Sequence, residues 1–273
     1  MITAKQITDF QEAVWDYYAR HNRSMPWRDE PTPYHVLVSE VMLQQTQVPR
    51  VVPKFLEFMA RFPTIATLAG APLSDVLAHW SGLGYNRRAK YLWEAAQSVV
   101  ARHNGELPST QDELVALPGI GPNTAGAILA YAYEQPVVFI ETNIRTVIIH
   151  YFFAGHDDKI TDAQIKGVMQ QALPAENPRE WYWALMDYGT HLKATAGGQL
   201  QRVHGYRKQS KFEGSRRQVR GKVLKLLLVG GRVAEALQNE ITDDRLPGVL
   251  AELKNEGLIE QRDTIWYLTG HTG

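Results

Sequence analysis

The chain has 273 residues, 44% hydrophobic and 21% charged, which suits a folded protein with room for two cores. It contains no cysteine, and this excludes disulfides, thiolate zinc sites and cysteine-ligated iron–sulfur clusters. Its 29 basic and 29 acidic residues cancel, so net charge alone does not indicate a nucleic-acid partner. No apolar run is long enough to span a bilayer, and the first residues lack the pattern of a signal peptide, so we expect a soluble, intracellular protein.

Helical periodicity dominates the first 192 residues, where strand signals are scarce. Proline residues mark a loop over 26–33, between the first two helices. The pattern predicts helices over 5–21, 34–47, about 53 to 61, 73–79, 86–103, 111–116, 123–133, 142–152, 161–172 and 179–192. We therefore expect a mostly α-helical body over residues 1–192.

The composition changes after residue 192. Residues 193–215 are rich in Gly, Gln, Ser and basic side chains, which predicts a basic linker. Residues 216–273 read as a small α+β domain, with helices over 219–228, 233–240 and from about 243 to a left-handed cap at Gly257. Two strands within 258–268 follow, about a polar turn at Arg262 and Asp263. Three helices and a hairpin resemble a winged helix, a fold that serves DNA binding and protein interaction alike.

Basic side chains are concentrated between residues 193 and 225, where Glu213 is the single acidic residue. They are Lys193, Arg202, Arg207, Lys208, Lys211, Arg216, Arg217, Arg220, Lys222 and Lys225. Such a segment is a typical footprint for phosphate binding, and a solvated charged linker is the equal alternative. Within it we predict that Arg216, Arg217 and Arg220 bind phosphates.

The string from Leu117 to Gly121, Leu-Pro-Gly-Ile-Gly, lies between two predicted helices. Its glycines allow a tight turn and close approach by another molecule. The helix that begins near Asn123 offers free N–H groups and the positive end of its dipole, which suit a phosphate. A corner between helices with no function is the alternative.

Two carboxylates stand in unusual surroundings. Glu40 lies in an apolar helix, where burial would raise its pKa and keep it protonated as a proton donor; a solvent-facing position is the alternative. Glu141 follows four apolar residues at a helix N-terminus, where the dipole would lower its pKa; a residue that merely stabilises its helix is the alternative. Together they match the division between acid and anion in the cleavage of a glycosidic bond.

From about Trp15 to Gly189 the chain resembles the MutY-type adenine DNA glycosylases of the helix-hairpin-helix superfamily. The matching strings are Pro26-Trp27-Arg28, Thr32-Pro33-Tyr34, the ten residues from Ser39 to Val48, Arg61-Phe62-Pro63-Thr64, Gly82-Leu83-Gly84-Tyr85, Leu117 to Gly121, Thr124 to Leu129, and Met186-Asp187.

The resemblance implies a two-lobed helix-hairpin-helix glycosylase fold that flips its target base out of double-stranded DNA. It assigns Glu40 as the acid and Gln44 and Gln45 as residues that contact the opposing base and wedge the duplex. It also implies a K⁺ or Na⁺ ion on the hairpin carbonyls. The further DNA contacts that we expect are Tyr85, Asn86, Arg87, Leu117, Gly119, Gly121 and Thr124.

The chain departs from this family at four places. Glu141 stands for the catalytic aspartate, one methylene longer. Asn123, a candidate catalytic residue, stands where bifunctional relatives carry the lysine that forms a Schiff base. Asn86 replaces a second tyrosine. The positions that correspond by spacing to the cluster cysteines fall near Lys193, Leu200, Val203 and Gln209.

The family's usual C-terminal domain, which helps to recognise 8-oxoguanine, is also expected to be absent, with the winged-helix-like domain in its place. We therefore predict a monofunctional, monomeric glycosylase without an iron–sulfur cluster, in the cytoplasm with the nucleoid, acting on adenine opposite 8-oxoguanine or guanine. A thymine or uracil mismatch glycosylase and a non-catalytic binder of DNA lesions are the alternatives.

Overall fold

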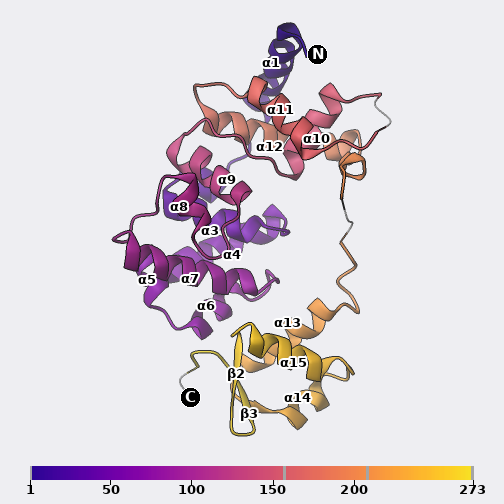
Figure 1. Cartoon of the computed structure of the whole chain (residues 1–273). Coiled ribbons are helices and arrows are strands. Elements are labelled where there is room, and N and C mark those ends of the chain that lie inside the picture. Colours follow the sequence, from indigo (N-terminus) through magenta and orange to yellow (C-terminus); the bar gives the residue numbers. More distant parts are fainter. Residues whose placement is uncertain (1, 156–157, 207–208, 272–273) are drawn as a thin grey trace. The chain divides into compact units, whose positions relative to one another are not determined.

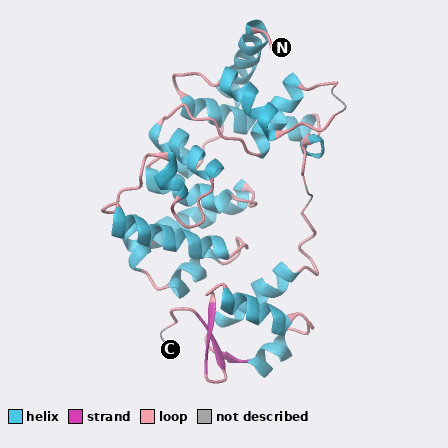
Figure 2. Ribbon diagram, viewed as in Figure 1, coloured by secondary structure: helices cyan, strands magenta, loops and turns pink. Residues whose placement is uncertain are grey.

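The structure, a computed structural model, describes residues 2–155, 158–206 and 209–271; Arg207 and Lys208 of the basic segment lie outside these ranges. Helices make up most of it (Figure 2). Over the described residues, none of the helices is both long and apolar enough to cross a membrane.

Two compact units divide the chain. The first contains Met1–Glu40, Ser109–Val115 and Ile120–Lys208, and the second contains Val41–Pro108, Ala116–Gly119 and Gln209–Gly273. The helix that carries Glu40, α3 (Pro33–Leu43), passes from one unit into the other.

The first unit is built around α12 (Pro178–Thr195), which packs against α10 (Thr142–Phe152), α1 (Ala4–His21) and α9 (Pro122–Tyr133) (Figure 1). Its remaining elements are α2 (Pro26–Asp29), α8 (Gln111–Val115), α11 (Asp162–Ala172) and the 3₁₀ turn η1 (Leu200–Arg202). Aromatic rings fill the core, where Phe10 makes edge contacts with Tyr151 and Trp181 at 5.0 and 5.7 Å between ring centroids. This packing places the start of α10 beside α12, which matters for the site.

The second unit contains α4 (Val48–Arg61), α5 (Ile65–Gly70), α6 (Leu73–Trp80) and α7 (Arg87–Arg102), followed along the chain by a small α+β part. That part comprises α13 (Arg216–Leu227), β1 (Arg232–Val233), α14 (Ala234–Glu240), α15 (Leu246–Asn255), β2 (Ile259–Arg262) and β3 (Ile265–Leu268). The three strands form an antiparallel sheet in the order β1-β3-β2. The three predicted helices and the hairpin are therefore confirmed.

Several boundaries differ from the predicted ones. The short helices α2 and α5, of four and six residues, were not predicted, whereas the five-residue α8 was. The helix α3 ends at Leu43 rather than at 47, and Gln45 takes a left-handed φ of 57°. Pro53 lies inside α4, five residues after its first residue, because the amphipathic pattern of α4 continues through it. The helix α12 continues to Thr195, so regular structure enters the first residues of the predicted linker.

Candidate active site

Glu40 lies near the end of α3, directly after the buried residues Val36, Leu37, Val38 and Ser39. Part of its surface stays accessible, but the carboxyl group is deeply desolvated, and burial raises its pKa to about 8. The nearby charge of Glu141 raises the pKa further, and Arg28 lowers it. Burial and a like charge both disfavour the ionised form. Glu40 is therefore mainly protonated at neutral pH and able to donate a proton.

Arg28 is held in place by Asp187 of α12. Its two terminal nitrogens donate hydrogen bonds of 2.9 Å to the two carboxylate oxygens of Asp187. Arg23 donates to the same carboxylate through its backbone N–H at 3.1 Å and its Nε at 2.8 Å. Asp187 is 2% exposed. This buried cluster joins two of the strings that carry the family resemblance.

Glu141 is the N-cap of α10. Its Oε1 accepts hydrogen bonds from the backbone N–H groups of Asn143 at 2.5 Å and Ile144 at 3.1 Å. Burial nevertheless raises its pKa, against the opposing effects of Lys193, the two N–H groups and Arg145. The prediction that the helix terminus lowers the pKa is wrong in its net direction, because desolvation outweighs the helix terminus.

Tyr131 of α9 lies close to both carboxylates and was not predicted as a site residue. Burial raises its pKa, and the charges of Glu40 and Glu141 add to the effect while Arg28 opposes it. Tyr131 is 5% exposed, and its ring stacks on that of Trp183 at 6.2 Å between centroids. A tyrosine among the small apolar side chains of α9 was the available sequence signal.

Asn123 lies in the first turn of α9, where its Oδ1 accepts a long hydrogen bond of 3.5 Å from the N–H of Ile140. Ile140 directly precedes Glu141, so Asn123 lies close in the fold to the segment that carries the second carboxylate. Gly121 is the N-cap of this helix and is exposed, and Thr124 is half-buried. The catalytic and DNA-binding roles of these residues stay predictions.

In the second unit, the buried side chain of Arg88 links the two segments that carry the predicted DNA contacts Gln44, Gln45 and Tyr85. It donates to the carbonyls of Val41 at 2.7 Å and Met42 at 2.9 Å, just before Gln44 and Gln45. It also donates to the carbonyl of Gly84 at 3.1 Å, just before Tyr85. Burial lowers the pKa of Arg88 to about 10. Sequence reasoning missed this residue, although it lies directly beside the predicted contacts.

Two of the predicted DNA contacts, Tyr85 and Gln45, form hydrogen bonds with residues of the basic segment. Arg217 donates a 2.7 Å hydrogen bond to the hydroxyl of Tyr85 and lies 5.4 Å from its ring centroid. Gln209 donates to Oε1 of Gln45 at 3.1 Å. Tyr85 has a left-handed φ of 49°, an uncommon conformation for this side chain. Asn86 and Arg87 follow at the start of α7.

Two of the three arginines predicted to bind phosphate form ion pairs with α15. Arg216 lies 2.8 Å from a carboxylate oxygen of Glu252, and Arg220 pairs with both Glu252 and Glu256. These acidic residues lie outside the basic segment, so its local sequence does not reveal them. Phosphate binding stays a prediction. A DNA phosphate would have to compete with Glu252 and Glu256 for the guanidinium groups of Arg216 and Arg220.

The hairpin string has a structural requirement of its own. Gly119 has a φ of 75°, and a Cβ there would lie 2.6 Å from the Cβ of Tyr91, so only glycine fits. Leu117 is buried. The hairpin offers backbone oxygens, the donor type that hard cations prefer. Elsewhere in the part of the chain that the structure describes, no group of three or more His, Asp or Glu residues is arranged to hold a metal.

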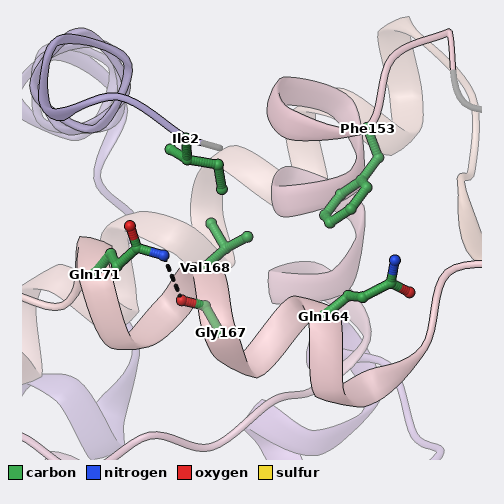
Figure 3. Close-up of a pocket in the computed structure, with 6 residues that line it drawn as sticks. All are labelled: Ile2, Phe153, Gln164, Gly167, Val168 and Gln171. Carbon is green, nitrogen blue, oxygen red and sulfur yellow. Dashed lines mark hydrogen bonds between the residues drawn. The ribbon is translucent and has the colours of Figure 1, made fainter.

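A surface depression in the first unit contains none of the predicted site residues (Figure 3). It is lined mainly by apolar surface, from Ile2, Phe153, Gln164, Gly167, Val168 and Gln171. We assign it no part in the chemistry of the two carboxylates.

Comparison with known proteins matches residues 38–171 to the HhH-GPD superfamily of base excision DNA repair proteins. The adenine DNA glycosylase of Mycolicibacterium smegmatis is 32% identical over 227 residues, which cover 77% of this chain and 78% of that protein. The chain belongs to the adenine DNA glycosylase family.

Other adenine DNA glycosylases match a smaller share of their own length. That of Buchnera aphidicola subsp. Baizongia pistaciae is 35% identical over 66% of this chain and 52% of the relative. The human protein is 36% identical over 67% of this chain and 36% of the relative. The chain thus spans about half the length of the Buchnera relative.

Solved structures show that the fold is that of the superfamily. A thermostable thymine-DNA glycosylase superimposes with a TM-score of 0.65 at 22% identity, over 73% of this chain and 93% of that one. Endonuclease III in a non-covalent complex with DNA superimposes with a TM-score of 0.62 at 20% identity, over 74% of this chain and 92% of that one. The predicted mostly α-helical glycosylase fold is confirmed.

Proposed function

We propose that the protein is a monofunctional DNA glycosylase that hydrolyses the N-glycosidic bond of adenine opposite 8-oxoguanine or guanine. The observation that carries this proposal is the difference between its two carboxylates. Burial raises the pKa of both carboxyl groups, to about 8 for Glu40, but at Glu141 two backbone hydrogen bonds and the charge of Lys193 oppose the rise. One group is suited to donate a proton, and the other to stabilise a cation.

In this mechanism the adenine is flipped from the duplex, and Glu40 protonates the base ring. The bond between the sugar C1′ and the base nitrogen then breaks, and the base takes the bonding electron pair. Positive charge develops on the sugar, where the Glu141 carboxylate stabilises it. A water molecule adds to C1′ and returns a proton to the Glu40 carboxylate, so the products are free adenine and an abasic site.

Strand cleavage is not part of this proposal, because Asn123 supplies no amine in the hairpin helix for a Schiff base. Double-stranded DNA is the proposed partner, in the cytoplasm with the nucleoid, and the working form is a monomer. The hairpin would bind a backbone phosphate with the help of a K⁺ or Na⁺ ion on its carbonyl oxygens.

A duplex panel tests the proposal. Labelled duplexes carrying A:8-oxoG, A:G, T:G, U:G or hypoxanthine are incubated with an excess of protein and then cleaved with alkali. We expect cleavage at adenine opposite 8-oxoguanine or guanine, and none without alkali. Cleavage of only T:G or U:G would establish a different glycosylase, and tight binding without cleavage of any duplex would establish a non-catalytic binder.

A further inference from the structure

Asn143, two residues beyond Glu141, is held by one face of α12. Lys193 Nζ donates a 2.6 Å hydrogen bond to the Asn143 Oδ1, and the Asn143 Nδ2 donates to Met186 Sδ at 3.6 Å. Between these two residues on the helix, a Cβ at Gly189 would lie 2.7 Å from both the Cβ and the backbone oxygen of Asn143. Positions 186, 189 and 193 share a face at 3.6 residues per turn, so Asn143 contacts α12 over about two turns of one face.

Asn143, which α12 holds in place, also binds the carboxylate of Glu141. The backbone N–H of Asn143 donates to Glu141 Oε1 at 2.5 Å, and that of Ile144 donates at 3.1 Å. A continuous path therefore runs from the ammonium group of Lys193, through Asn143, to Glu141. In the proposed reaction, a small shift of Asn143 would move the Glu141 carboxylate relative to the sugar of the flipped nucleotide.

We propose that Lys193 positions Glu141, by holding the Asn143 amide against α12, and supplies the positive charge that favours the carboxylate form. The inference rests on the proposed function and deepens it, since it assigns the support for the anion of that reaction. Lys193 itself touches no reacting atom in this assignment. It is a positioning residue.

The electrostatics agree with this geometry. Lys193 is half-buried; burial lowers its pKa and the charge of Glu141 raises it, while Lys193 in turn opposes the rise in the pKa of Glu141. The other groups that interact electrostatically with Glu141 are Arg145 on α10, Glu40 on α3 and Tyr131 on α9. Of the cationic side chains that act on Glu141, Lys193 has the larger effect.

A carboxyl titration tests the inference without requiring activity. The full chain, labelled with ¹³C at glutamate carboxyl carbons, is titrated by NMR as wild type, Lys193→Met, Lys193→Arg and the control Lys166→Met. Lys166 is exposed on α11 of the same unit. We expect the pKa of Glu141 to rise by about one unit in Lys193→Met. Lys193→Arg and Lys166→Met should leave it close to the wild-type value.

Single-turnover kinetics on the A:8-oxoG duplex supply the second readout. Lys193→Met should lower the rate on the order of 10- to 100-fold, move the acidic limb of the pH–rate profile to higher pH and leave the Kd for the duplex unchanged. Lys193→Arg should restore both rate and profile. If Lys193→Met does not fold, Lys193→Gln is the neutral variant.

Three results would overturn the inference. The first is an unchanged pKa of Glu141 in the neutral variants, and the second is a pH–rate profile of unchanged shape. The third is a borohydride-trapped protein–DNA adduct that Lys193→Met abolishes, since this would make Lys193 a nucleophile. If the wild type cleaves no duplex, the proposed function fails, and the titration still decides whether Lys193 supports Glu141.

Discussion

Arg28 binds Asp187 through two hydrogen bonds of 2.9 Å, and the same guanidinium lowers the pKa of Glu40. The pair ties the N-terminal segment to α12 directly beside the proposed acid. Its charge limits how far burial and Glu141 raise the pKa of Glu40. The ion pair thus links the stability of the first unit to the chemistry of its site.

We predict that Asp187→Asn destabilises the protein strongly. Removal of one partner of a buried ion pair leaves an uncompensated charge, which costs about 3–5 kcal/mol. Denaturant unfolding measures the loss, with Asp9→Asn as the control, because Asp9 pairs with Lys5 on the surface of α1. Equal midpoints for the two variants would contradict the structural role of the pair.

The pH–rate profile of the wild type should fall on its alkaline side. Glu40 must be protonated to donate, and its pKa is raised to about 8. Under single-turnover conditions we therefore expect the rate to drop above about pH 8, by up to tenfold per pH unit. The acidic limb should reflect protonation of Glu141, whose pKa is also raised. A rate that stays constant up to pH 10 would rule out Glu40 as the acid.

Glu40→Gln should make the protein more stable, by an amount that grows with pH. Between the ordinary pKa of 4.5 and about 8, Glu40 stays protonated in the folded state and ionises in the unfolded state. Unfolding then releases a proton, so the free energy of unfolding falls as pH rises across this window. Glutamine cannot ionise and avoids this loss. Thermal unfolding of the wild type and of Glu40→Gln at several pH values measures the difference. A difference in melting temperature that stays constant between pH 5 and 8 would refute the burial argument.

The joint substitution of Arg216, Arg217 and Arg220 by Gln should weaken DNA binding and flatten its salt dependence. Removal of one phosphate-binding cation reduces the slope of log K against log salt by about one. Since Arg216 and Arg220 pair with α15, Glu252→Gln with Glu256→Gln should free them and strengthen binding. Fluorescence anisotropy at several salt concentrations measures both, and an unchanged slope in the arginine variant would refute phosphate binding.

Much of the fold was predictable because long helices repeat their apolar residues. The helices α9, α10, α11 and α12 were located within a few residues, whereas α5 was missed and α2 lies in the proline-containing stretch that was predicted to be a loop. The end of α3 was misplaced because a distant residue, Arg88, binds the carbonyls of Val41 and Met42. The strand β1, with two residues, exists only through its pairing with β3.

The residue types of the site were predictable, but the pKa shift of Glu141 and the residues that support it were not. Glu40 and Glu141 stood out by their apolar surroundings, and a sequence can suggest burial of that kind. The sign of the pKa shift at Glu141 depends on the depth of its burial in three dimensions. Lys193 meets Asn143 across 50 residues of chain, and no local pattern could indicate that contact. For this reason the supporting residues emerge only from the structure.

The role of Glu40 is tested most directly by the single-turnover rate of Glu40→Gln on a duplex with adenine opposite 8-oxoguanine. Glutamine keeps the shape of the side chain and removes the proton that the carboxylic acid donates. We predict a rate at neutral pH that is lower than that of the wild type by about 10²- to 10⁴-fold, with binding of the duplex retained. A rate within a few-fold of the wild type would show that another group supplies the proton and would contradict the mechanism.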